Sequence, residues 1–330
     1  MNKDIRNILF IAPGGIGNLV LSIPSLRALK AQWPDAGITL LTCEAGVEKI
    51  LDHEGLVTDT VCFKATPGQD LFGCLSQVRT LRAKGFDMAV SAGGVNPLSS
   101  GMVGVLSGIP IRAGQAVNGG SWLYTQRSAY ASDEHELEGG LSVVQALGCP
   151  VVEKLPSLRI TSEEESEARD YCARLGIAAG TRLVGIHSGV GKKMHAQRQW
   201  PLERFVRVMD ALADTLGAVF VLTGGSHEQE DVRRIAALTR ATAFSTAGEL
   251  SLRGTAAVLK KCCLVISNDS GPAHIAAAVG TPLIVLFGPV DPVKSRARGE
   301  NVAVFSKEGP DRILRITPEE VILKAMEMLS

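Results

Sequence analysis

The sequence lacks the features that mark several common classes of protein. Its 34 basic and 34 acidic residues leave no net charge, so there is no basic footprint for nucleic acid. Its seven cysteines are scattered and form no Cys-X-X-Cys pair. That spacing disfavours a zinc site or a disulfide framework and is typical of buried thiols in a reducing compartment. We therefore expect a cytoplasmic protein with no nucleic-acid partner.

Targeting and membrane-spanning segments are also missing from the pattern. The first residues, MNKDIRNILF, contain no apolar region followed by a small-residue cleavage site. Residues 88–111 carry no charge, but glycine, serine and proline interrupt them repeatedly. This composition predicts a strand, a loop and a buried helix rather than a membrane span. We expect at most peripheral contact with the inner face of a membrane.

What the sequence does contain is a repeated alternation of strand and helix. A chain of 330 residues, 45% of them hydrophobic, is long enough for two domains. In the first half we expect strands at 7–13, 37–42, 58–64, 86–94 and 109–115, and helices at about 19–33, 70–85 and 135–150. In the second half we expect strands at 183–189, 218–225, 242–248, 263–269 and 282–289, separated by helices.

This alternation predicts an α/β fold in which parallel sheets carry helices on both faces. Residues 151–161, which include Pro156, form an extended linker between the halves. We therefore expect two facing Rossmann-like domains, residues 1–155 and 156–330. Ligands of such sheets bind at the carboxyl ends of the strands, which would place them in a cleft between the domains.

The stretch ISNDSGPAH in the second half predicts a phosphate site. A strand ends there, and a helix begins near Pro272, so free N–H groups and the positive end of the helix dipole point outward. The candidate residues are Asp269, Ser270, Gly271 and His274. The alternative is that Asp269 or Ser270 only caps the helix and that His274 is a satisfied surface histidine.

A glycine-rich turn near the start, APGGIGN, also connects a strand to a helix. Gly14, Gly15 and Gly17 would let backbone amides approach an acceptor or a diphosphate. The alternative is a simple strand-to-helix turn. A dinucleotide-dependent oxidoreductase is disfavoured, because the third glycine of Gly-X-Gly-X-X-Gly is missing and Glu44 matches the expected acidic residue only weakly.

Four segments together resemble glycosyltransferase family nine, the ADP-heptose:lipopolysaccharide heptosyltransferases. They are PGGIG…LLT at 13–42, HSGVG…ERF at 187–205, VLTGGSHEQE at 221–230 and SNDSG…VDP at 267–292. The resemblance implies a GT-B fold whose first domain binds a glycan or glycolipid acceptor and whose second binds a nucleotide-sugar, with ADP-heptose the expected donor. It also implies inversion at the sugar carbon with no metal ion and no cofactor. No Asp-X-Asp metal motif lies in a plausible loop.

The resemblance assigns further donor-site residues. Arg198 stands where the family often has a lysine that contacts the phosphates, and a metal-free enzyme needs such a charge for its leaving group. Lys192 and Lys193 are alternatives in the same loop, unless they are only charged residues of a solvated loop. Ser188 and Gly189 would offer hydrogen bonds to phosphate. Glu228 would approach the ribose or the adenosine, unless it is only an acidic residue in the first turn of a helix.

Asn18 departs from the family pattern, in which this position carries an acidic general base. A carboxamide cannot take a proton at neutral pH. Either another residue acts as the base, with His135, Glu136 and Glu138 as candidates, or the acceptor carries its own base. The third account is a non-catalytic protein that binds a nucleotide-sugar without transferring it. We favour an active transferase, because the donor half retains its phosphate-binding features.

Another possible activity of the same fold is that of a nucleotide-sugar epimerase or hydrolase. Such an enzyme would need acid and base carboxylates around the sugar in the second domain. Only Asp269 and Glu228 are placed for that purpose in the sequence pattern.

Overall fold

The structure, a computed structural model, describes residues 4–63, 71–116, 120–129, 133–190 and 198–330. The chain divides into two compact units. The first comprises residues 1–156 and 293–295, and the second comprises residues 157–292 and 296–330. Among the described residues, no helix combines the length and the hydrophobicity that a membrane span requires.

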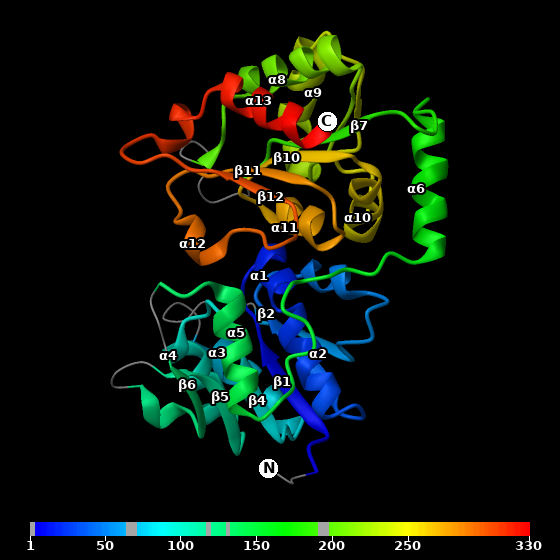
Figure 1. Cartoon of the computed structure of the whole chain (residues 1–330). Helices are drawn as coiled ribbons and strands as arrows, with labels where there is room; N and C mark the ends of the chain where they lie inside the picture. Colours follow the sequence, from blue (N-terminus) through cyan, green and yellow to red (C-terminus); the bar gives the residue numbers. More distant parts are fainter. Residues whose placement is uncertain (1–3, 64–70, 117–119, 130–132, 191–197) are drawn as a thin grey trace. The chain divides into compact units, whose positions relative to one another are not determined.

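The first unit is built on six parallel strands in the order β3-β2-β1-β4-β5-β6 (Figure 1). The strands are β1 (Asn7–Ile11), β2 (Gly37–Thr42), β3 (Asp59–Cys62), β4 (Met88–Ser91), β5 (Ile111–Ala116) and β6 (Gln126–Ala129). The helices are α1 (Ile16–Leu21), α2 (Ile23–Gln32), α3 (Leu71–Ala83), α4 (Pro97–Leu106) and α5 (Glu136–Ala146), with short 3₁₀ turns η1 (Val47–Leu51) and η2 (Ser121–Leu123). Helix α5 packs on α2 and on strands β4, β5 and β6.

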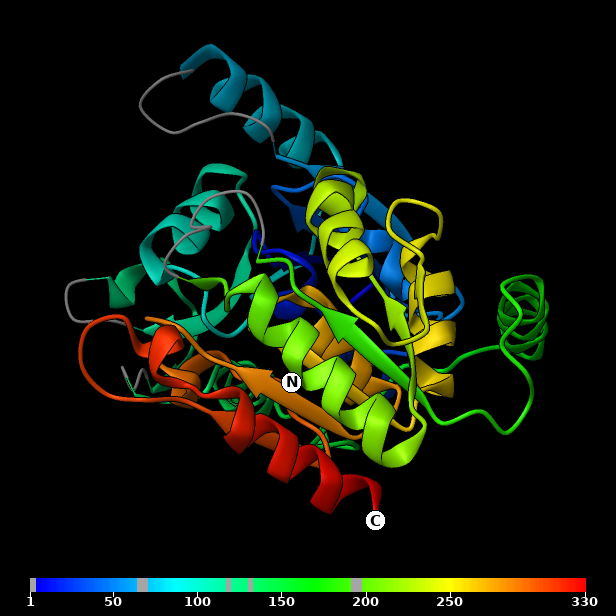
Figure 2. The ribbon, with the colours of Figure 1, turned by 90° about the horizontal axis from the view of Figure 1, so that it is seen from above.

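The second unit repeats this design with a sheet of order β12-β11-β10-β7-β8-β9. Its strands are β7 (Leu183–His187), β8 (Val219–Leu222), β9 (Ala243–Ser245), β10 (Leu264–Asn268), β11 (Leu283–Leu286) and β12 (Val302–Phe305). Its helices are α6 (Ser162–Arg174), α8 (Leu202–Leu216), α9 (Gln229–Leu238), α10 (Leu252–Lys261), α11 (Gly271–Ala278) and α13 (Pro318–Leu329), with α12 (Pro292–Ser295) at the boundary and 3₁₀ turns η3 (Ser226–Glu228) and η4 (Arg312–Arg315). Helix α13 runs alongside α8 (Figures 1 and 2).

The strand orders place one topological switch point in each sheet. In the first unit the chain moves from β1 outward to β2 and β3 and then returns to β4 on the other side of β1. In the second unit β7 and β10 are the corresponding neighbours. Open α/β sheets bind ligands in the crevice outside the carboxyl ends of such a strand pair. The loops that follow β1, β4, β7 and β10 are therefore the places where a site is expected.

Two details differ from the sequence-based prediction. The predicted helix at 19–33 is wrong as a single element, since α1 ends at Leu21 and α2 begins at Ile23, with Pro24 in its first turn. Proline has no N–H to donate and is accommodated at the start of a helix rather than in its interior. Each sheet also has six strands instead of five, because the edge strands β6 and β12 were not predicted.

An apolar core on one side of the second sheet fixes the chain next to the carboxyl end of β10. Trp200 is fully buried and packs edge-to-face on Phe205, with ring centroids 5.0 Å apart. Its indole N–H donates to the carbonyl of Ile316 at 3.0 Å. A buried aromatic side chain with a satisfied polar atom contributes strongly to core stability. The segment that follows Arg198 is thereby anchored.

A buried ion pair attaches α6 to α10 in the second unit. Arg253 donates from Nε and Nη2 to the two carboxylate oxygens of Glu164, at 2.8 Å each, and also donates to the carbonyl of Arg159. Burial raises the pKa of Glu164, but hydrogen bonds from Arg253 and from the Thr161 N–H outweigh it and hold the pKa at about 2. Folding is therefore linked to the ionisation of this carboxyl group.

We expect Glu164 to make stability fall at acid pH. Because its pKa is depressed in the folded state, its contribution is complete above the ordinary value of 4.5 and is lost as the pH falls towards 2. The loss between pH 6 and pH 3 should be about 2 kcal/mol. Urea unfolding at both pH values should show a correspondingly smaller pH dependence for Glu164→Gln. Glu165→Gln, on the exposed side of the same helix, should keep most of the wild-type dependence.

Candidate functional site

The glycine-rich turn after β1 is shaped by the side chain of Asn18, which stands in α1. A Cβ atom placed on Gly14 would lie 2.3 Å from Asn18 Oδ1, so the asparagine side chain occupies the space over this glycine. A Cβ atom on Gly15 would lie 3.2 Å from Glu44 Oε2. A larger residue at position 14 would displace Asn18. The glycine is thus required by a close approach, in addition to forming the turn.

Asn18 donates a hydrogen bond to the carboxylate of Glu136. The distance from Asn18 Nδ2 to Glu136 Oε2 is 2.5 Å. Glu136 is the first residue of α5, 118 positions later in the chain. The hydrogen bond brings together a residue of α1, the helix that follows the glycine-rich turn, and a residue of α5, the helix that covers β4. A carboxylate therefore lies within hydrogen-bonding distance of the position where the sequence carries a carboxamide.

Two glycines after β4 make room for Glu136. A Cβ atom on Gly93 would lie 1.7 Å from the Glu136 carbonyl oxygen, and one on Gly94 would lie 2.3 Å from Glu136 Cγ. Gly94 also has a φ of +73°, which residues with a side chain rarely adopt. The chain leaving β4 therefore passes directly against the first turn of α5. The carboxylate of Glu136 lies at the switch point between β1 and β4.

His135 and Glu138, which the sequence suggested as bases, contact each other. His135 is buried, and its Nδ1 accepts a hydrogen bond from the Leu137 N–H as the N-cap of α5. Glu138 Oε2 lies 3.2 Å from the same nitrogen atom. Glu136 stands between them in sequence, and it is this residue that bonds Asn18. Whether His135 or Glu138 contributes to catalysis stays a prediction.

In the second unit, buried Asn268 joins the two strand ends at the switch point. Its Nδ2 donates to the carbonyl of Ser188, after β7, at 2.6 Å, and its Oδ1 accepts from the Trp200 N–H at 3.2 Å. Asn268 is fully buried at the end of β10. These bonds fix Ser188 and the residues after Arg198 relative to Asp269. Sequence reasoning overlooked Asn268, although it directly precedes Asp269 in the ISNDSG stretch.

Asp269 and Arg198 form an ion pair at this point. Asp269 is 6% exposed, and an Arg198 Nη2 donates to its Oδ2. Burial raises the pKa of Asp269, and the neighbouring guanidinium group of Arg198 partly counteracts this effect. Arg198 itself is partly accessible, with a quarter of its side chain exposed. The partly exposed guanidinium group of Arg198 is thus held beside Asp269, at the carboxyl end of β10.

The N-terminus of α11 follows directly. Ser270 is its N-cap, and the Ser270 hydroxyl donates to the carbonyl of Asn268 at 3.1 Å. Gly271 and Pro272 occupy the first turn, and His274 is 6% exposed. His274 is therefore buried rather than a surface histidine. The helix start and the guanidinium group of Arg198 are both adjacent to Asp269, and each is suited to an anion.

Glu228 is a buried carboxylate in the turn η3. Its Oε2 accepts from the Gly225 N–H at 2.7 Å, and a Cβ atom on Gly189 would lie 1.6 Å from its Oε1. His187 Nε2, at the end of β7, lies 3.9 Å from Glu228 Oε1. Burial lowers the pKa of His187, although the Glu228 carboxylate opposes that shift. The structure thus explains why position 189 is glycine, and it shows that the Glu228 carboxylate at the end of η3 bonds back to the residue before the turn.

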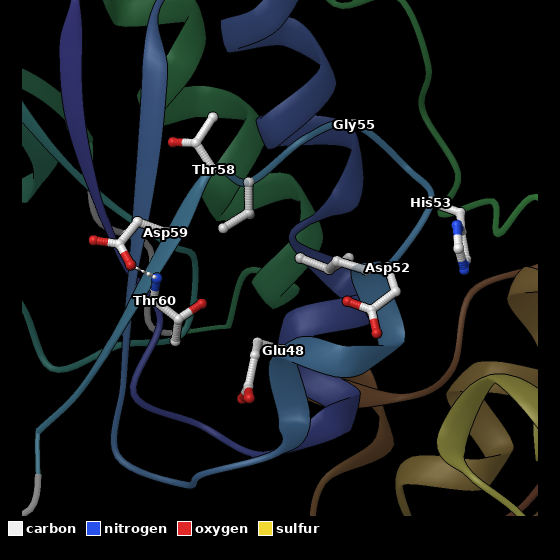
Figure 3. Close-up of a pocket in the computed structure, with 9 residues that line it drawn as sticks. Glu48, Asp52, His53, Gly55, Thr58, Asp59 and Thr60 are labelled. Carbon is white, nitrogen blue, oxygen red and sulfur yellow. Dashed lines mark hydrogen bonds between the residues drawn. The ribbon is translucent and has the colours of Figure 1, made fainter.

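The remaining candidate residues and a hollow at β3 give little support for a nucleotide site. Lys192 and Lys193 lie outside the described residues. Within the described ranges, no group of three or more histidine, cysteine, aspartate or glutamate side chains could hold a metal ion. Figure 3 shows a hollow at the edge strand β3, which is lined by Glu48, Asp52, His53, Thr58, Asp59 and Thr60 among others. Its carboxylates do not suit an anionic nucleotide.

The chain is similar to known heptosyltransferases. The family model described as glycosyltransferase family 9 (heptosyltransferase) matches residues 74–316. Lipopolysaccharide heptosyltransferase 2 of Escherichia coli K12 is 26% identical over 308 residues, which cover 86% of this chain and 83% of the relative.

Solved structures share the fold. The structure of E. coli ADP-heptose lipopolysaccharide heptosyltransferase II has a TM-score of 0.77 at 23% identity, covering 98% of each chain. An E. coli heptosyltransferase solved with ADP has a TM-score of 0.71 at 19% identity, covering 98% of this chain and 99% of that one. These likenesses confirm the predicted GT-B fold of two Rossmann-like sheets.

Proposed function

Because the chain belongs to glycosyltransferase family 9, the heptosyltransferases, we propose that it transfers a heptose from ADP-heptose to a lipopolysaccharide-type acceptor. In this proposal the reaction inverts the sugar carbon and uses no metal ion. Residues 1–155 bind the acceptor, and residues 156–330 bind the donor. Relatives that are named as lipopolysaccharide heptosyltransferases support the substrate class, and a related enzyme solved with ADP supports the nucleotide.

The observation that carries the proposal is the pairing of Arg198 with the start of α11 at a switch point. A diphosphate leaving group develops negative charge as the sugar departs, and a site without a metal ion needs positive charge and N–H groups to stabilise it. Arg198 supplies the charge, and the N-terminus of α11 after Ser270 supplies oriented amides and the positive end of a helix dipole. Ser188 and Gly189, at the end of β7, complete the proposed phosphate site.

Two further residues are assigned by this proposal. His274 lies in the first turns of α11 and lines the same site, and Glu228 reads the ribose or the adenosine after a change in its hydrogen bonding. Gly14, Gly15 and Gly17 form the acceptor loop of the first unit. In this proposal the enzyme acts at the membrane face that presents the glycolipid acceptor, and it contacts that membrane only peripherally.

Nucleotide selectivity tests the proposal directly. A ligand at about a hundred times its dissociation constant stabilises a fold by about 2.7 kcal/mol. We expect ADP to raise the melting temperature without magnesium, and UDP, GDP and CMP to raise it less. A shift with a different nucleotide would replace the proposed donor. No shift with any nucleotide would contradict the phosphate site.

Binding of ADP to single variants tests the roles of Asp269 and His274. Asp269→Ala should weaken ADP binding at least about tenfold, a loss of about 1.4 kcal/mol, because Arg198 loses the carboxylate that positions it. His274→Ala should also weaken binding. Titration calorimetry with ADP measures both effects, and circular dichroism confirms that the fold is kept. Unchanged affinity in both variants would remove the diphosphate from this place.

A nucleotide-sugar-binding protein without transferase activity is the second candidate, favoured only by the carboxamide at Asn18. It predicts the same melting shifts with ADP but no release of ADP from ADP-heptose in the presence of acceptor. A coupled assay for ADP release therefore separates the two candidates.

A further inference from the structure

The carboxylate nearest to Asn18 comes from another part of the chain. Glu136 Oε2 accepts the hydrogen bond from Asn18 Nδ2 at 2.5 Å, and the side chain of Glu136 is partly exposed. Gly93 and Gly94 have no side chains, and Glu136 occupies the space that their Cβ atoms would otherwise fill. The carboxylate is therefore held at the switch point of the first sheet, next to the glycine-rich turn, without being sealed in the core.

We propose that Glu136 is the general base of the reaction and that Asn18 orients it. The proposal rests on the transferase function proposed above. It assigns the proton-accepting role to Glu136 at the start of α5 and the orienting role to Asn18 in α1. Position 18 lacks a carboxylate, and Glu136 supplies one from 118 residues further along the chain, within hydrogen-bonding distance of the Asn18 side chain.

The chemical step is a displacement at the sugar. The acceptor hydroxyl gives its proton to a Glu136 oxygen, while the hydroxyl oxygen uses an electron pair to form the bond to the anomeric carbon. The bond from that carbon to the diphosphate oxygen breaks, and its electron pair leaves on the diphosphate. Glu136 then releases its proton to water. A carboxylate can perform this task, and the neutral amide of Asn18 cannot.

The hydrogen bond also explains why an amide suits position 18. Two carboxylates at a separation of 2.5 Å would repel, and one of them would hold a proton near neutral pH. An asparagine donates an N–H to Glu136 instead and stabilises its ionised form. The hydrogen bond therefore holds one carboxylate in a fixed orientation.

Neighbouring acidic groups have other partners. Glu138 lies 3.2 Å from His135 Nδ1. Glu134 accepts from Gln115 Nε2 at 3.1 Å, and burial together with the charges of Glu138 and Asp133 raises its pKa. Neither of these two contacts involves Asn18. Within the described part of this segment, Glu136 is the carboxylate that the structure places on the loop.

The test first removes the carboxylate of Glu136 and then exchanges the carboxylate and the amide between positions 136 and 18. Glu136→Gln keeps the shape of the side chain and removes its ability to take a proton. We expect kcat to fall about 100- to 10,000-fold, with KM for both substrates within about threefold of the wild type and with an unchanged ADP-induced melting shift. The double variant Glu136→Gln/Asn18→Asp reverses the hydrogen bond, so that position 18 in α1 carries the carboxylate and position 136 in α5 carries the amide. It should regain at least about tenfold in kcat over Glu136→Gln.

Glu134→Gln is the matched control, because it removes a carboxylate two positions away that contacts Gln115 instead of the loop. It should keep kcat near the wild-type value. A Glu136→Gln variant that keeps full activity would overturn the inference, as would a folded exchange variant with no recovery or an equal loss in Glu134→Gln. A wild-type protein that binds ADP but never transfers sugar would instead overturn the proposed function.

Discussion

Arg198→Met should lower kcat about 100- to 1,000-fold, the usual cost of removing one group that stabilises developing negative charge. The physical reason is the position of the guanidinium group, which is paired with Asp269 and adjacent to the start of α11. In a site without a metal ion, the leaving diphosphate depends on this charge. Steady-state assays of ADP release from ADP-heptose measure the effect.

Two companion variants separate charge from shape. Arg198→Lys retains a positive charge at the position where the family often has a lysine, so it should stay within about tenfold of the wild-type kcat. Arg207→Met removes an arginine from an exposed ion pair with Glu319 on the same unit and should leave kcat unchanged. If Arg198→Met folded normally and lost less than threefold, the leaving group would have to be stabilised by other residues.

Arg253→Met should be the most damaging of the stability variants. It leaves the carboxylate of Glu164 buried without the guanidinium group that binds both of its oxygens. Breaking a buried ion pair in this way costs about 3–5 kcal/mol. For a unit of this size, such a loss lowers the melting temperature by about 10 °C. Urea and thermal unfolding of the variant measure it.

The neighbouring ion pair provides the control. Lys260 and Glu165 join the same two helices, α10 and α6, at a separation of 2.7 Å, but both side chains are 41% exposed. Lys260→Met should therefore cost less than about 1 kcal/mol. The double variant Arg253→Met/Glu164→Leu should recover most of the stability, because apolar side chains can replace a buried ion pair at little cost. A double variant as unstable as the single one would show that the arginine acts through packing.

Much of the fold was predictable because buried parallel strands are continuous apolar runs. GITLLT coincides with β2, and the runs that form β7 and β10 are rich in valine, leucine and isoleucine and fully buried. The edge strands gave weaker signals. β6, with the sequence QRSA, contains no apolar run, and β12, with the apolar sequence VAVF, is short and only partly buried. The opposite edge strands, β3 and β9, lie within predicted strands, so an edge position alone does not hide a strand.

The sequence could predict which strand ends form the candidate site, but it could not predict which side chains contact each other there. Residues after β7 and β10 were expected at one crevice because parallel strands present their carboxyl ends together. The contact between Asn18 and Glu136 joins positions 118 residues apart, and no local periodicity encodes which side chain of a helix start will reach a distant loop. The clearest signal in the sequence was the pair Gly93 and Gly94. The structure explains both glycines, because a Cβ atom at either position would clash with Glu136 at the start of α5.

The matching strand orders of the two sheets have an evolutionary consequence. Read outward from β1 and from β7, both units follow the wiring 3-2-1-4-5-6, so every strand has a counterpart in the other half. Duplication of a half-length gene is the simplest origin of such a pair. The equivalent crevices now differ in chemistry: one holds a carboxylate with an amide, and the other holds a guanidinium group with a helix start. In the functions proposed above, one crevice receives a proton and its counterpart binds a diphosphate, so the same strand order serves two different chemical tasks.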